Sequence, residues 1–161
     1  MPLSPAERTT LIDKYARGYT VLSAALAKVP KEAMQWRPGP KQWSVHEIIV
    51  HCADSESYAH VRLRILLGSE PPAIHGYDQA RWAEVLDYHT LPIDTSLRTV
   101  EAVRANTVPL LRRMTEAQWG IMGTHSEVGP YGTEGWLKTY SQHLEKHAGQ
   151  IERNLAAWRN R

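Results

Sequence analysis

The stretch 44-SVHEIIVHCADSESYAHVRLRILLG-68 carries helix signals at both ends and along its length. At the start, the Ser44 side chain can accept a hydrogen bond from the amide of Glu47 while the Glu47 carboxylate reaches back, which is a capping box. At the end, Gly68 can adopt the left-handed conformation that closes a helix. Apolar residues recur between them at three- and four-residue spacing, at Ile48, Cys52, Ala59, Leu63 and Leu66. The pattern predicts a helix over residues 45–67 with one face turned to a core.

The segment before it begins with the same signal. Ser4 and Glu7 form a second capping box, Pro5 suits the first helical position, and Pro30 ends the segment. Leucine and tyrosine residues recur between these limits at helical spacing. We therefore predict a first helix over residues 5–29.

Two more helices are predicted downstream. Asp94 is a suitable cap for a helix over residues 95–114, which contains Pro109 and should kink there. Thr133 is the predicted cap of one continuous last helix. The apolar stripe of that helix consists of Leu137, Tyr140, Leu144, Ala148, Ile151, Leu155 and Trp158.

A long connection, residues 68–93, separates the second and third predicted helices. Within it, Asp78 is predicted to cap a short helix that ends near Leu86. No segment shows the alternation of a strand. The sequence thus predicts an all-α protein, a four-helix bundle with a long crossover connection, in a single domain over residues 1–161.

Composition and charge narrow the class of protein. Lysine and arginine number 19 against 17 acidic residues, for a net charge of +2, and the charges are interspersed. Such a surface lacks the basic stripe that nucleic acid requires. No apolar run is long enough to cross a membrane, the start of the chain does not resemble a signal peptide, and Cys52 is the only cysteine. We expect a soluble cytoplasmic protein that acts on a small molecule, with no nucleic-acid or membrane partner.

Histidines provide the strongest functional signal. In 140-YSQHLEKHAGQIERN-154, His143 and His147 are four residues apart beside the apolar stripe, a spacing that lets two imidazoles bind one ion. His51 lies in the same relation to the stripe of the second helix, so the three rings can meet across the bundle. Three protein ligands leave room for water or substrate, as in catalytic sites. The HLEKH spacing places Glu145 on another face, which excludes a metalloprotease site of the HExxH type.

A plainer interpretation of these histidines remains open. Two histidines four residues apart occur often by chance, and His51 beside an apolar stripe can be a hydrogen-bonded core residue. Cys52 lies within the stripe itself and is predicted to be inert.

Six further residues could line or support the site: Glu47, Asp54, Tyr58, His125, Tyr140 and Gln150. Glu47 and Asp54 could orient His51, although Glu47 is explained equally by its capping role. Tyr58 and Tyr140 could line the pocket or simply pack in the core. His125 could reach the mouth of the site from a loop or lie exposed on it.

Two arginines occupy unexpected positions. Arg62 and Arg104 lie on apolar-facing stripes. Each could pair with a carboxylate, meet an anionic thiol cosubstrate, or extend its charged end to solvent.

Four stretches, RPGPKQWSVHEIIVHCADSE, YDQARWAE, LPIDTSL and YSQHLEKHAGQI, give the chain a family resemblance. They span most of residues 37–152, and the chain resembles the DinB/YfiT-like superfamily of metal-binding four-helix bundles, especially the branch with bacillithiol-dependent S-transferases. The resemblance implies one divalent metal ion, nickel or zinc, held by His51, His143 and His147. The family often has more histidines in the last helix, where this chain has Lys146 and Gly149.

The resemblance also implies a reaction class. It favours a metal-dependent enzyme that transfers a low-molecular-weight thiol to an electrophile in detoxification. A hydrolase that uses a metal-bound water needs the same three ligands and remains an alternative. A third possibility is a non-catalytic, stress-related metal-binding bundle; a partnership with damaged DNA lacks support from charge.

We also expect a homodimer. The basis is analogy with relatives and the six tryptophans, which provide aromatic surface that an interface could bury.

Overall fold

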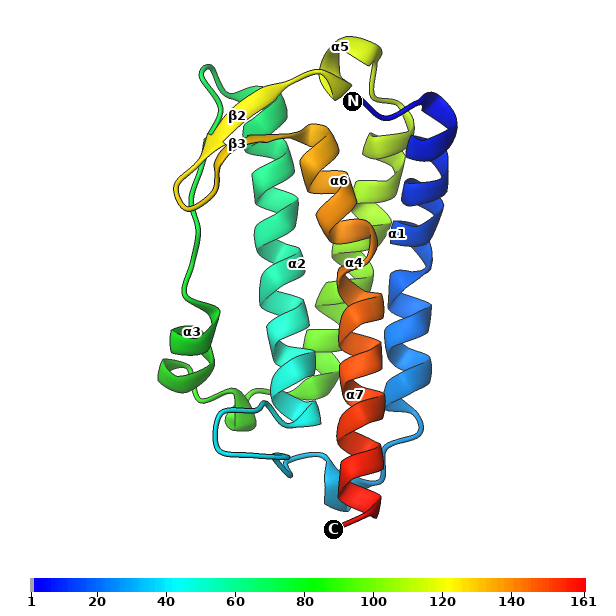
Figure 1. Cartoon of the computed structure of the whole chain (residues 1–161), viewed down its shortest axis with the longest axis vertical. Helices are drawn as coiled ribbons and strands as arrows, with labels where there is room; N and C mark the ends of the chain where they lie inside the picture. Colours follow the sequence, from blue (N-terminus) through cyan, green and yellow to red (C-terminus); the bar gives the residue numbers. More distant parts are fainter. Residues whose placement is uncertain (1) are drawn as a thin grey trace.

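The computed structural model describes residues 2–161 and contains four long helical rods (Figure 1). The first three are α1 (Pro5–Leu26), α2 (Val45–Gly68) and α4 (Ile93–Arg112), and the fourth consists of α6 (Thr133–Ser141) and α7 (His143–Arg159). The rods α1 and α6–α7 run in one direction and α2 and α4 in the other (Figure 1). The predicted all-α four-helix bundle is confirmed. Both predicted capping boxes, at the starts of α1 and α2, are present.

The crossover segment, residues 69–92, returns the chain along the whole bundle before α4 begins. It contains α3 (Gln79–Val85), whose predicted cap is confirmed by the hydrogen bond from the Arg81 amide to the Asp78 carboxylate at 2.9 Å. It also contains the short 3₁₀ helix η2 (Tyr88–Thr90). Because of this return, α2 and α4 are parallel neighbours.

A small sheet at one end of the bundle contradicts the prediction of a chain without strands. Its strands are β1 (Ala73–Ile74), β2 (Met122–His125) and β3 (Gly129–Gly132), in the order β1-β2-β3. β2 and β3 form an antiparallel hairpin in which Thr124 faces Pro130, and β1 pairs in parallel with β2. Strands of two to four residues are too short to show alternation, which is why the sequence did not reveal them.

The third long helix begins two residues earlier than predicted. α4 starts at Ile93 after Pro92, and Asp94 lies in its first turn without acting as the cap. The hydroxyls of Thr95 and Ser96 donate to the Pro92 carbonyl. Pro109 lies inside this helix, as predicted. Two shorter helices, η1 (Lys31–Ala33) and α5 (Glu116–Trp119), lie in the connections.

The prediction of one continuous last helix is wrong. The helix is interrupted at Gln142, and its first cap is Gly132 in place of Thr133. Near the interruption, the buried Arg104 guanidinium donates to the Tyr140 carbonyl at 3.0 Å. In an unbroken helix that carbonyl would accept from the amide four residues on, so the arginine provides it with another donor. The interruption places His143 in the first position of a new helix.

The core fills the space between the rods. Fully buried side chains include Leu22 of α1, Ile48 of α2, Val100 of α4 and Leu144 of α7. Each contributes roughly 1.5–3 kcal/mol to stability through removal from water. Among residues 2–161, no helix combines the length and apolar character that a membrane crossing requires.

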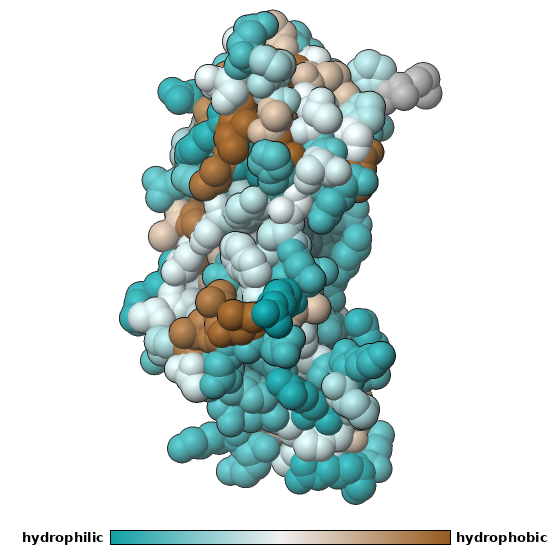
Figure 2. Space-filling model, turned by 90° about the vertical axis from the view of Figure 1, so that its left-hand side faces the viewer, coloured by the Kyte–Doolittle hydropathy of each residue, from teal (hydrophilic) through white to brown (hydrophobic). Residues whose placement is uncertain are grey.

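The exposed apolar residues do not include a tryptophan. The large ones are Val21, Val61, Val85, Leu86, Met122 and Val128. One face of the molecule shows brown atoms in two separate groups, one high and one low (Figure 2). Trp119 and Trp136 are buried in the core, and the other four tryptophans are half-buried.

Candidate metal centre

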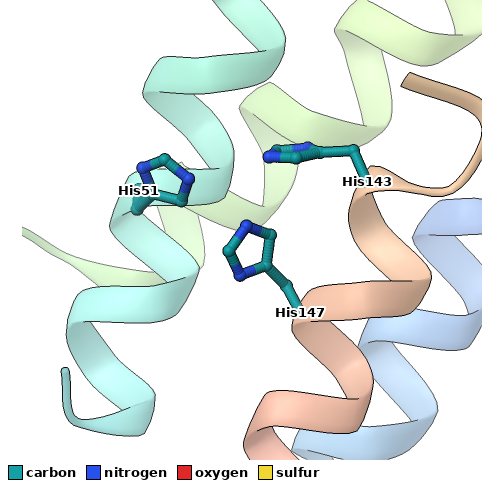
Figure 3. A group of neighbouring side chains, drawn as sticks. All are labelled: His51, His143 and His147. Atoms are coloured by element: carbon teal, nitrogen blue, oxygen red, sulfur yellow. The ribbon is translucent and has the colours of Figure 1, made fainter. Parts of the chain in front are cut away.

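Three imidazole rings converge from two helices. His51 comes from α2, and His143 and His147 come from the first two turns of α7 (Figure 3). The ring centroids are 4.7 Å apart for His143 and His147, 4.8 Å for His51 and His147, and 5.7 Å for His51 and His143. One ring nitrogen from each residue lies within 4.8 Å of the others. The structure thus brings together the three histidines that the sequence placed on facing flanks.

The orientation of His143 is fixed by Glu56. Its Nδ1 lies 2.8 Å from Oε1 of that carboxylate, which can only accept, so Nδ1 carries the hydrogen and donates. The other ring nitrogen of His143 is Nε2. The Ser55 hydroxyl is 3.3 Å from this nitrogen.

Glu56 is in turn held by Arg104. The guanidinium donates Nε–H to Oε2 at 3.0 Å and Nη2–H to Oε1 at 2.7 Å, and both side chains are almost completely buried. It also donates to the backbone oxygen of Tyr15. Gly18 of α1 makes room for this group, because a Cβ there would overlap the guanidinium. The core therefore contains a connected chain from Arg104 through Glu56 to His143.

The other two histidines differ in whether Nδ1 has a hydrogen-bond partner. The Nδ1 of His147 lies 3.0 Å from the Gln150 side-chain oxygen and donates to it, which leaves Nε2 as a lone pair. His51 packs against the Trp43 ring, with centroids 4.7 Å apart. Its Nδ1 is buried and has no hydrogen-bond partner among the described residues. A buried nitrogen of this kind needs a partner, and a metal ion is one that an imidazole nitrogen binds.

The protonation states suit a metal ligand set. Burial, together with the neighbouring imidazoles, lowers the pKa of His51 to about 2. Burial and the adjacent His143 lower the pKa of His147 to about 4. Both rings are neutral at pH 7, so their lone pairs are available. Neutral imidazole nitrogens are preferred ligands of zinc and nickel, and the residues present therefore fit such an ion.

Burial would raise the pKa of Glu56, but Arg104 and the hydrogen bond from His143 hold it below the ordinary value. The carboxylate remains charged and continues to orient His143.

Two residues predicted to orient His51 are engaged elsewhere. Glu47 caps Ser44 and forms an ion pair with Arg37. Asp54 accepts a hydrogen bond from Tyr88 at 2.6 Å. The capping explanation therefore accounts for Glu47, and Asp54 serves to fasten the crossover segment to α2.

The remaining predicted residues differ in their relation to the histidines, and Tyr58 is not among those that line the cavity next to His143. Tyr140 and His125 line a cavity of about 350 Å³ that has His143 in its wall. Tyr58 packs against Tyr77 and Trp82 of the crossover segment. Gln150, besides bonding His147, lines a second cavity of about 650 Å³. Cys52 is fully buried, and burial raises the pKa of its thiol.

The sequence interpretation missed Glu56, Ser55 and Trp43. A signal for Glu56 existed, because it falls four residues after Cys52 and three before Ala59, on the apolar stripe of α2. Arg104 occupies an equivalent position on the stripe of α4. A glutamate and an arginine on two core stripes indicate a buried ion pair. Of the possibilities considered for Arg104, pairing with a carboxylate is the one that the structure shows.

Comparison with known proteins identifies relatives of this chain. A family model described as the DinB superfamily matches residues 14–151. A protein of Oceanobacillus iheyensis named as a proposed metal-dependent hydrolase is 34% identical over 109 residues, which cover 68% of this chain and 63% of that protein. One of Geobacillus thermodenitrificans with the same kind of name is 32% identical over 136 residues, which cover 81% of this chain and 74% of that protein.

A solved structure agrees with the fold. YfiT from Bacillus subtilis, described as a proposed metal-dependent hydrolase with an unusual four-helix bundle topology, superposes with a TM-score of 0.87 at 24% identity. The match covers 94% of this chain and 87% of that one. In sequence, the chain spans 63% of the length of the first two curated relatives that it matches.

Proposed function

Because this chain belongs to the DinB superfamily, we propose that it is a metal-dependent enzyme whose single divalent ion, nickel or zinc, is held by His51, His143 and His147. The observation that carries the proposal is the convergence of three ring nitrogens within 4.8 Å of one another. The buried Nδ1 of His51 and the neutral state of His51 and His147 support it. Proposed metal-dependent hydrolases among the relatives support the same class.

We further propose that the reaction is the transfer of a low-molecular-weight thiol to an electrophile. When bound, the ion acts as a Lewis acid that lowers the pKa of a coordinated thiol or water. In the transfer, sulfur forms a bond to the electrophilic carbon, the leaving group departs with its electron pair, and the thiol proton passes to solvent. Glu56 and Gln150 keep the ring nitrogens of His143 and His147 aimed at one point throughout.

The carboxylates near the histidines favour thiol transfer over hydrolysis. A hydrolase benefits from a free carboxylate that removes a proton from water. Glu56, Glu47 and Asp54 are all bonded to other protein groups. A thiol ionises far more readily than water and has less need of a base.

Hydrolysis remains the second candidate, favoured by the names of the relatives and by Glu127. This carboxylate lines the cavity next to His143 but is exposed to solvent. A water-activating role would require it to move toward the histidines.

Metal retention tests the class of protein. We expect His51→Ala and His147→Ala to lose the ion while the far-ultraviolet circular dichroism spectrum stays helical. The measurement is elemental analysis of protein purified without a histidine tag. A matched control is His60→Ala, which changes a histidine of α2 bonded to Thr107 outside the cluster. Full metal content in both cluster variants would exclude the proposed site.

A reaction screen then separates the two chemistries. Several thiols are offered to the metal-loaded protein with a chromogenic electrophile such as 1-chloro-2,4-dinitrobenzene, and ester and amide substrates are offered without thiol. Thiol-dependent turnover that is lost in His147→Ala supports transfer. Turnover of the esters alone would support hydrolysis.

We also propose a homodimer. Support comes from exposed apolar residues on the β2–β3 hairpin, Met122 and Val128, and on or beside α3, Val85 and Leu86. Light scattering at micromolar concentration tests the proposal, and a monomeric mass would contradict it.

A further inference from the structure

Of the α2 carboxylates near the histidines, two are paired with arginines, and Asp54 accepts from the Tyr88 hydroxyl. Glu56 is neutralised by Arg104, and Glu47 by Arg37. The three imidazoles supply no negative charge, so a divalent ion bound by them would keep its full charge. A site of this kind favours a ligand that carries an anionic group.

Arg62 adds a second positive charge beside it. The cavity of about 350 Å³ has His143 and Arg62 in its lining, and it falls within the size range of small-molecule sites. Within residues 2–161, no carboxylate lies within ion-pair distance of Arg62, in contrast to Arg8, Arg37 and Arg104. The exposed Glu127 shares the cavity without forming an ion pair with it. A half-buried guanidinium without a counter-charge is unusual.

The position of the guanidinium is nevertheless fixed. It lies over the ring of Tyr58 at 4.6 Å and near that of Tyr77 at 5.9 Å, and it donates to the backbone oxygen of His75. Its Nε is buried and has no acceptor among the described residues. Stacking and hydrogen bonds therefore hold the group in place while one donor stays unused.

Tyr140 supplies a second donor between Arg62 and the histidines. Its phenolic oxygen accepts from Arg62 Nη1 at 3.1 Å, so its own proton is not used in this contact. The Tyr140 ring is 5.7 Å from the ring of His143. The hydroxyl can thus donate to a ligand that lies between the guanidinium and the imidazoles.

We propose that this cavity binds the carboxylate of the small-molecule substrate, with Arg62 as counter-charge and the Tyr140 hydroxyl as second donor. The other end of the substrate then reaches the three histidines. The proposal rests on the function proposed above and narrows its substrate to molecules with a carboxylate, such as carboxylated thiols. Arg62 is the specificity-determining residue for that group.

Two thiols of equal length test the charge preference. Protein loaded with nickel or cobalt is titrated with 3-mercaptopropionate and with 3-mercapto-1-propanol, and binding is followed by the thiolate-to-metal absorption band. We expect the wild type to prefer the carboxylate probe by about tenfold or more, since hydrogen bonds to charged groups are the strong ones. In Arg62→Met the two affinities should agree within about twofold, with little change for the neutral thiol.

Two further variants distinguish charge recognition from loss of structure. Arg64→Met removes the same charge from the same helix, where Arg64 is exposed and bonds only the His60 carbonyl among the described residues; it should retain the preference. Arg62→Lys should retain part of the preference for the carboxylate probe. Equal affinities in the wild type, or an unchanged preference in Arg62→Met, would overturn the proposal.

A measurement without metal separates this proposal from the previous one. Propionate added to metal-free protein should shift the ¹⁵N–¹H signal of Arg62 Nε, assigned by its absence in Arg62→Lys. If the protein never binds a divalent ion but this signal shifts, the metal centre is wrong and the carboxylate site stands. If the ion binds and propionate shifts nothing at tens of millimolar, the carboxylate site is wrong and the metal centre stands.

Discussion

Helix α2 carries two buried glutamates. Both carboxylate oxygens of each accept hydrogen bonds from one arginine, and the two pairs differ mainly in how exposed that arginine is. The Arg37 side chain that binds Glu47 is 50% exposed, whereas the Arg104 side chain that binds Glu56 is 2% exposed. Glu47 fastens a loop and caps the helix, while Glu56 also receives the hydrogen bond from His143. The comparison indicates that the inner pair combines stability with site geometry and the outer pair serves local structure alone.

The largest expected effect comes from leaving the inner glutamate without its arginine. Arg104→Met should lower the free energy of unfolding by about 3–5 kcal/mol, because it leaves a buried carboxylate unpaired. Arg37→Met should lower it by about 1 kcal/mol or less, since water can replace an exposed arginine. Urea denaturation of both variants at pH 7 measures the difference.

A double variant provides the control. Glu56→Met combined with Arg104→Met removes both charges and should recover a large part of the stability lost in Arg104→Met. Equal losses in Arg104→Met and Arg37→Met would show that burial does not distinguish the two pairs.

A smaller effect concerns metal affinity. Glu56→Gln should weaken binding of zinc or nickel about 10- to 100-fold, because a neutral amide orients the His143 ring less firmly than a carboxylate. Glu47→Gln should leave the dissociation constant within about twofold. Competition with a chromophoric chelator gives both constants, and similar losses in the two variants would contradict a special role for Glu56.

The smallest effect is the pH dependence of the outer pair. Burial raises the pKa of Glu47, but the Arg37 hydrogen bond and the Ser44 amide outweigh it, and His89 adds to them when protonated, so the pKa lies below its ordinary value of 4.5. A lowered folded-state pKa gives stability that is present above the unfolded value and is lost as pH falls through the folded value. The free energy of unfolding of the wild type should therefore be about 1 kcal/mol higher than that of Glu47→Gln at pH 7. This difference in stability should shrink below pH 4.5.

Thermal or urea unfolding of the pair of proteins from pH 7 to pH 3 checks this trend. A difference that stays constant through acid would mean that the Glu47 charge contributes nothing.

The sequence was informative wherever a local rule decides the structure. Capping boxes located α1 and α2, and helical periodicity placed His51, His143 and His147 on flanks that do meet. The interruption at Gln142 was not predictable from local sequence signals, and the contact beside it, from Arg104 to the Tyr140 carbonyl, comes from another helix. The support of His143 by Glu56 was missed for a similar reason, since these two residues are 87 residues apart in the chain.

The crossover segment also has a consequence for how the chain folds. In an up-and-down bundle, each helix can pair with the next one through a short turn. Here α2 and α4 can pack only after the 24 residues 69–92 have folded back along the whole molecule. Closing a loop of that length costs chain entropy before any contact compensates for it, and a higher contact order slows folding. We therefore expect the seam between the two parallel rods α2 and α4 to close late in folding.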